Sequence, residues 1–121
     1  MKTILFLIMS ILVLSACDFI GVCDTGYQPG IEIVFKNEAG EFIASEVTAV
    51  VFDGNYQDTL TESHSDQGHV ISLAGAHERS GVYSLVVVSD LYETYTKSGI
   101  IVMNGKCHVK AAKFEVTLTH K

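Results

Sequence analysis

The stretch VYSLVVVS, residues 82–89, decides the fold of this chain. Three β-branched residues stand together in it, Val86, Val87 and Val88. Branching at Cβ restricts χ1 and suits a pleated sheet better than a helix. We therefore predict a strand here and expect it to be a central one.

Further strand patterns lie on the N-terminal side of this stretch. Ile31, Ile33 and Phe35 alternate against Glu32 and Lys36, which is the period of a half-buried strand. Three more strands are predicted at residues 47–52, 56–61 and 69–74, the second of them short and at a sheet edge. Residues 62–68 are polar, and we expect a loop there.

A hairpin is predicted near the C-terminal end of the sequence. Asn104 and Gly105 stand between apolar segments, and this pair favours a tight two-residue turn in which both residues have positive φ. In the strand that follows, the apolar positions change from odd to even numbers between Ala111 and Ala112. A β-bulge at that point would reconcile the two phases.

These patterns define the expected fold class. About seven short strands, one proline and no amphipathic helix predict an all-β, antiparallel β-sandwich of the immunoglobulin-like or transthyretin-like kind. We expect a single domain over residues 28–121.

Three short motifs carry a resemblance to a known family. They are ERSGVY at residues 78–83, SGI at 98–100 and CHV at 107–109. With the final alternating strand they resemble bacterial carboxypeptidase-regulatory-like domains, over roughly residues 28–120. The resemblance implies that the step from Gly81 to Tyr83 turns the chain into a core strand. Tyr83 would then pack inward, and its hydroxyl should find a backbone partner.

The N-terminal residues resemble a lipoprotein signal peptide. Residues 4–14 are apolar except for Ser10, and as a helix they would span about 16 Å, half of a bilayer core. The following LSAC, residues 14–17, resembles a bacterial lipobox, which implies cleavage after residue 16 and a diacylglycerol on the sulfur of Cys17. The alternative is an ordinary signal peptide that ends near a cysteine. Residues 17–27 would form a lipidated cysteine and short tether.

The lipobox resemblance also implies a location. An exported, lipid-anchored protein would reside in the bacterial cell envelope, held to the membrane by its acyl chains. Asp18 follows the cysteine and resembles the signal that retains Gram-negative lipoproteins in the inner membrane, on its periplasmic face.

Two cysteines remain if Cys17 is lipidated. In an oxidising compartment Cys23 and Cys107 are expected to form a structural disulfide. A redox pair and metal-binding thiolates are the alternatives, although neither cysteine belongs to a Cys-x-x-Cys motif.

The charge of the processed chain is strongly negative. Without residues 1–16 it has seven basic and fourteen acidic side chains, a formal charge of −7. Such a surface is a poor partner for nucleic acid and for anionic lipid headgroups. We expect no nucleic-acid partner.

No catalytic motif is present in the sequence. It lacks Gly-x-Ser-x-Gly, His-Glu-x-x-His and a phosphate-binding glycine loop. The hydroxyisourate hydrolases share the sandwich fold and carry a C-terminal Tyr-Arg-Gly-Ser, whereas this sequence ends in LTHK. We therefore expect no enzymatic activity, no catalytic residues and no cofactor apart from the covalent lipid.

Two functions of different class are consistent with the sequence. The first is a non-catalytic, lipid-anchored lipoprotein that presents its sandwich to an envelope protein or ligand. The second is a small-ligand or metal-binding lipoprotein that uses the histidine-rich segment 64–69, where His64, Asp66 and His69 could together bind zinc or copper. A solvated connection explains the same residues.

Overall fold

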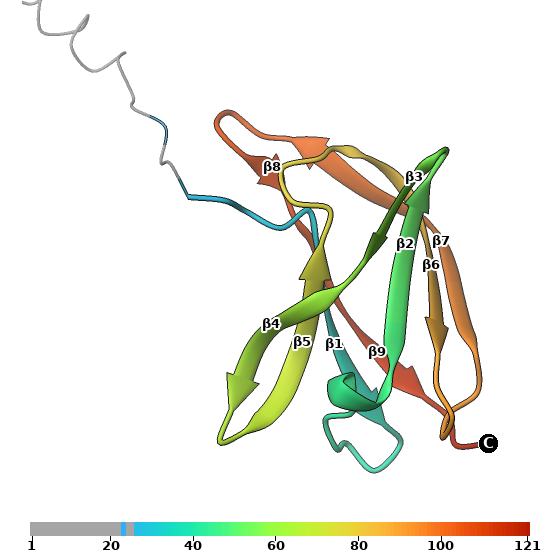
Figure 1. Cartoon of the computed structure of the whole chain (residues 1–121). Helices are drawn as coiled ribbons and strands as arrows, with labels where there is room; N and C mark the ends of the chain where they lie inside the picture. The colour runs from blue at the N-terminus through green and yellow to red at the C-terminus, as the bar shows by residue number, and fades with distance from the viewer. Residues whose placement is uncertain (1–22, 24–25) are drawn as a thin grey trace, which may run out of the picture.

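The computed structural model describes residue 23 and residues 26–121, which contain nine strands and one short 3-10 turn (Figure 1). The strands are β1 (Ile31–Asn37), β2 (Thr48–Asp53), β3 (Tyr56–Thr59), β4 (Thr61–Asp66), β5 (His69–Gly75), β6 (Gly81–Val88), β7 (Tyr95–Asn104), β8 (Val109–Lys110) and β9 (Ala112–Leu118). The 3-10 turn η1 (Ala44–Glu46) precedes β2. No helix in this described part of the chain has the length and apolar character needed to cross a membrane.

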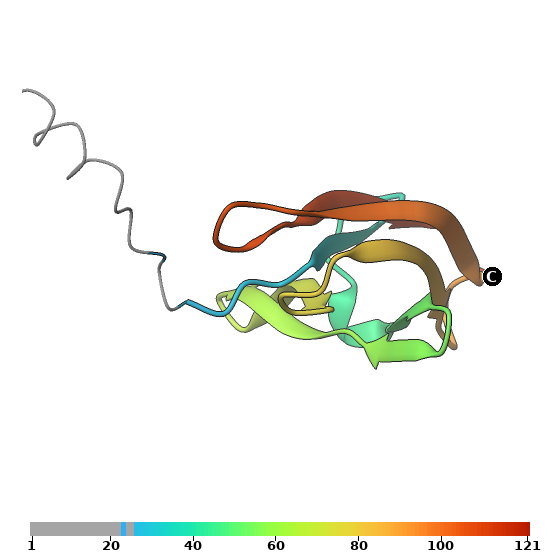
Figure 2. The same cartoon turned by 90° about the horizontal axis from the view of Figure 1, so that it is seen from above.

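The strands form two sheets that face each other as the layers of a sandwich (Figure 2). One sheet has the order β4-β5-β1-β9 and the other β3-β2-β6-β7-β8. The predicted all-β sandwich is therefore confirmed, and β6 is the middle strand of the larger sheet, as its sequence led us to expect. One pair departs from the antiparallel prediction, because β9 runs parallel to β1.

The core lies between the two sheets. Alternate residues of β1 and β6 point into it, including Ile33, Phe35, Tyr83 and Leu85, all fully buried. The residues between them are more exposed, as the period of two requires, and in β6 they include the apolar Val82 and Val88. This burial is the main favourable contribution to folding.

Residues 62–68 correct one sequence-based prediction. They were expected to form a loop, but most of them belong to β4, which pairs with β5 at the edge of the smaller sheet. Every residue of β4 is exposed, so neither face shows the apolar alternation by which strands are recognised. Positive φ at Gln67 and Gly68 closes the tight turn to β5.

The hairpin between β7 and β8 was predicted correctly, but its turn was not. Asn104 pairs with Val109, so four residues rather than two lie between the strands, and neither Asn104 nor Gly105 has positive φ. The amide of Gly105 donates to the carbonyl of His108 at 2.8 Å, and a Cβ on Gly105 would collide with that carbonyl. Position 105 therefore requires glycine, because any larger side chain would displace the His108 carbonyl.

The phase change at Ala111 also has a different cause from the one predicted. β8 pairs with β7 in the larger sheet, whereas β9 pairs with β1 in the smaller one. The chain thus crosses between the sheets at Ala111, and this crossing replaces the expected bulge. Splitting this strand in two and adding β4 changes the predicted seven strands to nine.

The strand directions define two ends of the sandwich (Figure 1). The hairpin end carries the β7–β8 hairpin, the β5–β6 loop (76–80) and the β2–β3 turn (54–55). The opposite end carries the β1–β2 connection (38–47), the β4–β5 turn (67–68) and the β6–β7 loop (89–94).

Candidate functional site

The disulfide predicted between Cys23 and Cys107 is confirmed. It joins residues 84 positions apart, with their Cα atoms 5.3 Å from each other. Cys107 lies in the β7–β8 hairpin, so the bridge ties the N-terminal segment to that hairpin. Cys17, the predicted lipidation site, lies outside the described residues, as do the signal peptide and Asp18.

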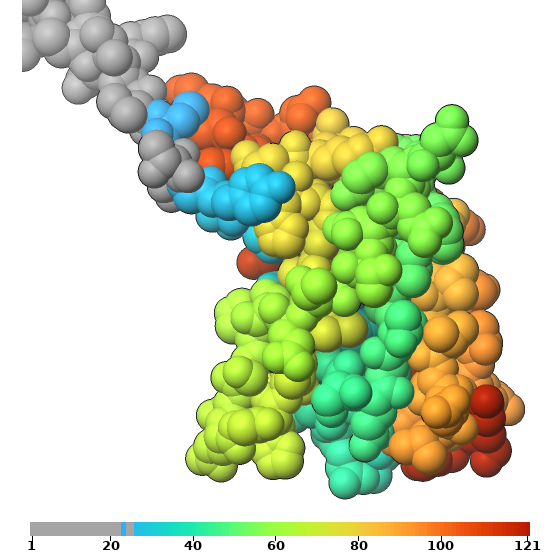
Figure 3. Space-filling model, in the orientation of Figure 1, coloured from blue at the N-terminus to red at the C-terminus, as the bar shows by residue number. Residues whose placement is uncertain are grey.

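Glu78 holds the same end of the molecule together. Its amide donates to the carbonyl of Gln28 at 2.9 Å, and its carboxylate accepts from the amide of Gln28 at 3.3 Å. Both oxygens of that carboxylate contact Nδ1 of His108, at 2.9 and 3.0 Å. Glu78 therefore joins the N-terminal segment, the β5–β6 loop and the hairpin, which Figure 3 shows packed together.

Arg79, beside it, organises a second polar cluster. Its Nη1 donates to Oδ2 of Asp53 at 2.9 Å and to the hydroxyl of Tyr83 at 3.0 Å. The guanidinium also lies 3.9 Å from the centre of the Tyr56 ring, a cation–π contact. Hydrogen bonding to Tyr83, and then to Asp53, raises the pKa of Arg79. This cluster ties the start of β6 to the β2–β3 turn.

Gly81 opens β6, and Tyr83 points from that strand into the core. Tyr83 is fully buried, and its hydroxyl donates to the carbonyl of Arg79 at 2.7 Å, which supplies the expected backbone partner. A Cβ on Gly81 would collide with the carboxylate of Asp53. Gly81 thus makes room for the ion pair between Asp53 and Arg79.

The raised pKa of Tyr56, whose ring contacts Arg79, predicts how the stability of the fold changes at alkaline pH. Burial, followed by the negative charge of Asp58, raises the pKa of Tyr56. A pKa higher in the folded state gives stability that is fully present below about pH 10 and is lost as pH rises through the folded pKa. We expect the wild type to lose stability above about pH 10 more steeply than Tyr56→Phe, measured by urea unfolding across that range. Equal slopes for the two proteins would show that Tyr56 has no such linkage.

The three candidate metal ligands do not converge. Asp66 and His69 are paired across the β4–β5 turn, but His64 pairs with Ser72, and its Nδ1 lies 3.2 Å from the carboxylate of Glu32. Among residues 23 and 26–121, no group of three or more His, Cys, Asp or Glu side chains is arranged to hold a metal ion. No observation within that part of the chain favours the metal-binding alternative.

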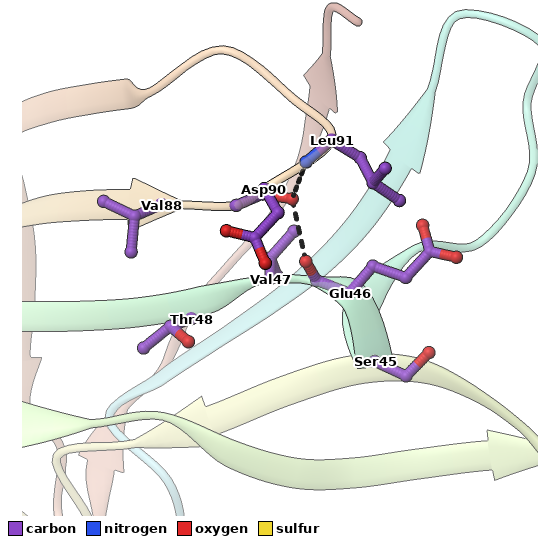
Figure 4. Close-up of a pocket in the computed structure, with 8 residues that line it drawn as sticks. Ser45, Glu46, Val47, Thr48, Val88, Asp90 and Leu91 are labelled. Atoms are coloured by element: carbon purple, nitrogen blue, oxygen red, sulfur yellow. Dashed lines mark hydrogen bonds between the residues drawn. The ribbon is translucent and has the colours of Figure 1, made fainter. Parts of the chain in front are cut away.

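A groove of about 490 Å³ lies at the opposite end, between η1 and the end of β6 (Figure 4). The Ser89 hydroxyl donates to the carbonyl of Glu46 at 2.9 Å and accepts from the amide of Leu91 at 3.1 Å, which fixes the two walls. The groove is lined by Ser45, Glu46, Val47, Thr48, Val88, Ser89, Asp90 and Leu91. Two carboxylates beside exposed Val88 and Leu91 suit a ligand with both basic and apolar groups.

Acidic side chains gather at the groove's end of the molecule. Six of them belong to its loops or to the residues beside them: Glu38, Glu41, Glu46, Asp66, Asp90 and Glu93. By contrast, residues 104–114, which form the hairpin turn, β8 and the start of β9, contain three lysines and no acidic residue. Net charge alone did not reveal this separation, although the sequence contains it.

Neither the Arg79 cluster nor the links through Glu78 were predicted as sites. The motif ERSGVY drew attention to Gly81 and Tyr83, whereas Asp53, Tyr56 and His108 are brought beside it only by folding. Comparison with protein-family models, curated proteins and solved structures finds no match for this chain.

Proposed function

We propose that this protein is a non-catalytic, lipid-anchored lipoprotein of the bacterial cell envelope with a carboxypeptidase-regulatory-like sandwich. Its role would be to bind or support an envelope partner. The LSAC motif at residues 14–17 supports the anchor, and Asp18 favours the periplasmic face of the inner membrane in a Gram-negative cell.

The disulfide is the observation that carries this proposal. Cys23 follows Cys17 by six residues, which reach at most about 20 Å when fully extended. Because Cys23 is bonded to Cys107, an anchor at Cys17 keeps the hairpin end close to the membrane. The opposite end, with its carboxylate-lined groove, would then face away from the membrane toward a partner.

Intact mass spectrometry of the protein extracted from membranes tests the anchor. We expect a chain that begins at Cys17, carries a diacylglycerol and gains two hydrogens on reduction. Cys17→Ser is the control and should yield no lipidated product. An unlipidated wild-type chain would refute the anchor, independently of the disulfide.

A charge reversal tests the groove as the partner surface. A photo-crosslinking side chain at Leu91 should capture an envelope protein, and Glu46→Lys with Asp90→Lys should reduce that capture several-fold if basic groups are recognised. A crosslinker at Thr59, on the edge strand β3, serves as the control position. Equal capture with and without the two charge reversals would exclude the groove as this surface.

A further inference from the structure

Exposed apolar side chains at the hairpin end form one continuous surface. Val82 and Ile101 lie directly opposite each other on β6 and β7, and Met103 lies two residues beyond Ile101. Paired residues of antiparallel strands, and residues two apart on one strand, share a face of the sheet. Val82, Ile101 and Met103 are 57%, 61% and 58% exposed, so nothing in the described part of the chain covers them.

Lysines border this apolar surface. Met103 pairs with Lys110, which therefore lies on the same face, and Lys106 is exposed in the hairpin turn. We call Val82, Ile101, Met103, Lys106 and Lys110 the hairpin face. Apolar side chains flanked by lysines suit the boundary between headgroups and acyl chains of an anionic bilayer.

The acidic groups nearest the hairpin face are engaged with the protein itself. Asp53 pairs with Arg79, Glu78 contacts His108, and Asp58 accepts from the amide of Ala76 at 2.8 Å. Glu32 and Glu62 belong to the other sheet, and Glu32 accepts from the Ser63 hydroxyl at 2.7 Å. The large acidic group is at the opposite end, so an anionic surface would repel the groove end more strongly than the hairpin face with its two lysines.

We infer that the hairpin face docks onto anionic phospholipid and sets the orientation of the sandwich on the membrane. The inference rests on the proposed function, since the tether from Cys17 to Cys23 is what brings the hairpin to the bilayer. The tether and the surface chemistry therefore point to the same part of the molecule. The disulfide attaches the tether to the hairpin, and the exposed apolar side chains and lysines lie on that hairpin and the strands beside it. The negative net charge of the whole chain argued against contact with anionic lipid. That total does not represent the hairpin face, where Lys106 and Lys110 are the charged residues.

Tryptophan fluorescence can test the docking directly, because the chain contains no tryptophan. Residues 17–121 are coupled through Cys17 to vesicles that contain a maleimide-bearing lipid, so attachment does not depend on lipidation in the cell. Cys17 is the only free thiol, since the other two cysteines are bonded. Ile101→Trp probes the hairpin face, and Phe42→Trp is the matched control at the opposite end, where Phe42 is 43% exposed.

On phosphatidylglycerol vesicles with brominated acyl chains, we expect Ile101→Trp to shift to shorter wavelength and to be strongly quenched. Phe42→Trp should remain unshifted and unquenched. Quenching of both probes, or of neither, would overturn the inference. Failure to quench together with a dimer in sedimentation would overturn it too, and would indicate that a second copy covers the face.

The lysine contribution is tested with the uncoupled chain carrying Cys17→Ser. Lys106→Ala with Lys110→Ala should weaken binding to these vesicles by up to about 30-fold at low salt, which corresponds to about 1 kcal/mol per lysine. Lys36→Ala with Lys121→Ala, near the opposite end, is the matched control and should leave binding unchanged. Equal losses in the two pairs would contradict a specific role for the hairpin face.

Discussion

Replacing both bridged cysteines, Cys23→Ser with Cys107→Ser, should lower the free energy of unfolding by about 4 to 5 kcal/mol. The bridge closes a loop of 84 residues, and a loop of that length strongly restricts the unfolded chain. A domain of this size has only about 5 to 15 kcal/mol of stability in total. Loss of the bridge therefore places the fold near its limit.

Urea unfolding of residues 17–121 measures this effect. All variants carry Cys17→Ser, so that no free thiol can exchange with the bridge. Reduction of the bridged protein is the control and should reproduce the loss seen in the double variant. If the free energy of unfolding fell by less than about 1 kcal/mol, the expected restriction of the unfolded chain by the bridge would be contradicted.

Tyr83→Ala is the second change with a large expected effect, a loss of about 3 to 5 kcal/mol. The ring fills the centre of the core and lies edge-on to the ring of Tyr56, with 6.1 Å between centroids. Its hydroxyl also satisfies the carbonyl of Arg79 and accepts from the guanidinium of the same residue. The substitution removes both kinds of contact.

Tyr83→Phe separates the two contributions. It keeps the ring and removes only the hydroxyl, so we expect the free energy of unfolding to fall by about 1 kcal/mol, because the hydrogen bonds lost are only partly buried. Tyr27→Ala is the control, because that ring is 73% exposed and its loss should change stability by less than about 0.5 kcal/mol. If Tyr83→Phe were as stable as the wild type, water would have to replace the hydroxyl at the Arg79 carbonyl.

The contacts that stabilise the hairpin end would also set the orientation of the sandwich on a membrane. On the proposed function, the disulfide and Glu78 fix the hairpin against the N-terminal segment. A rigid connection between anchor and sandwich would hold the hairpin face on the bilayer and the groove away from it. Loss of the bridge should therefore loosen orientation on the membrane as well as reduce stability.

The net charge of the whole chain does not describe how charge is distributed over its surface. A formal charge of −7 over residues 17–121 argues against contact with anionic lipid. Yet the hairpin turn, β8 and the start of β9 contain only basic charges, at Lys106, Lys110 and Lys113. Because screening limits charge interactions to about 10 Å, the local charge governs surface contact.

The sequence by itself determined the strands with a buried face. In β1 and β6, apolar residues alternate or cluster because one side of each strand must leave water, and this requirement is visible in the residues. The cysteine count and the expected export likewise sufficed to predict the bridge between Cys23 and Cys107.

Only the tertiary structure decided the features that depend on distant partners. β4 is a strand because β5 supplies its hydrogen bonds, although its exposed residues show no pattern. Ala111 became a crossing between sheets because β1 was available to pair with β9. The Arg79 cluster and the hairpin face arise in the same way, because residues far apart in the chain meet only when the strands of the larger sheet pair.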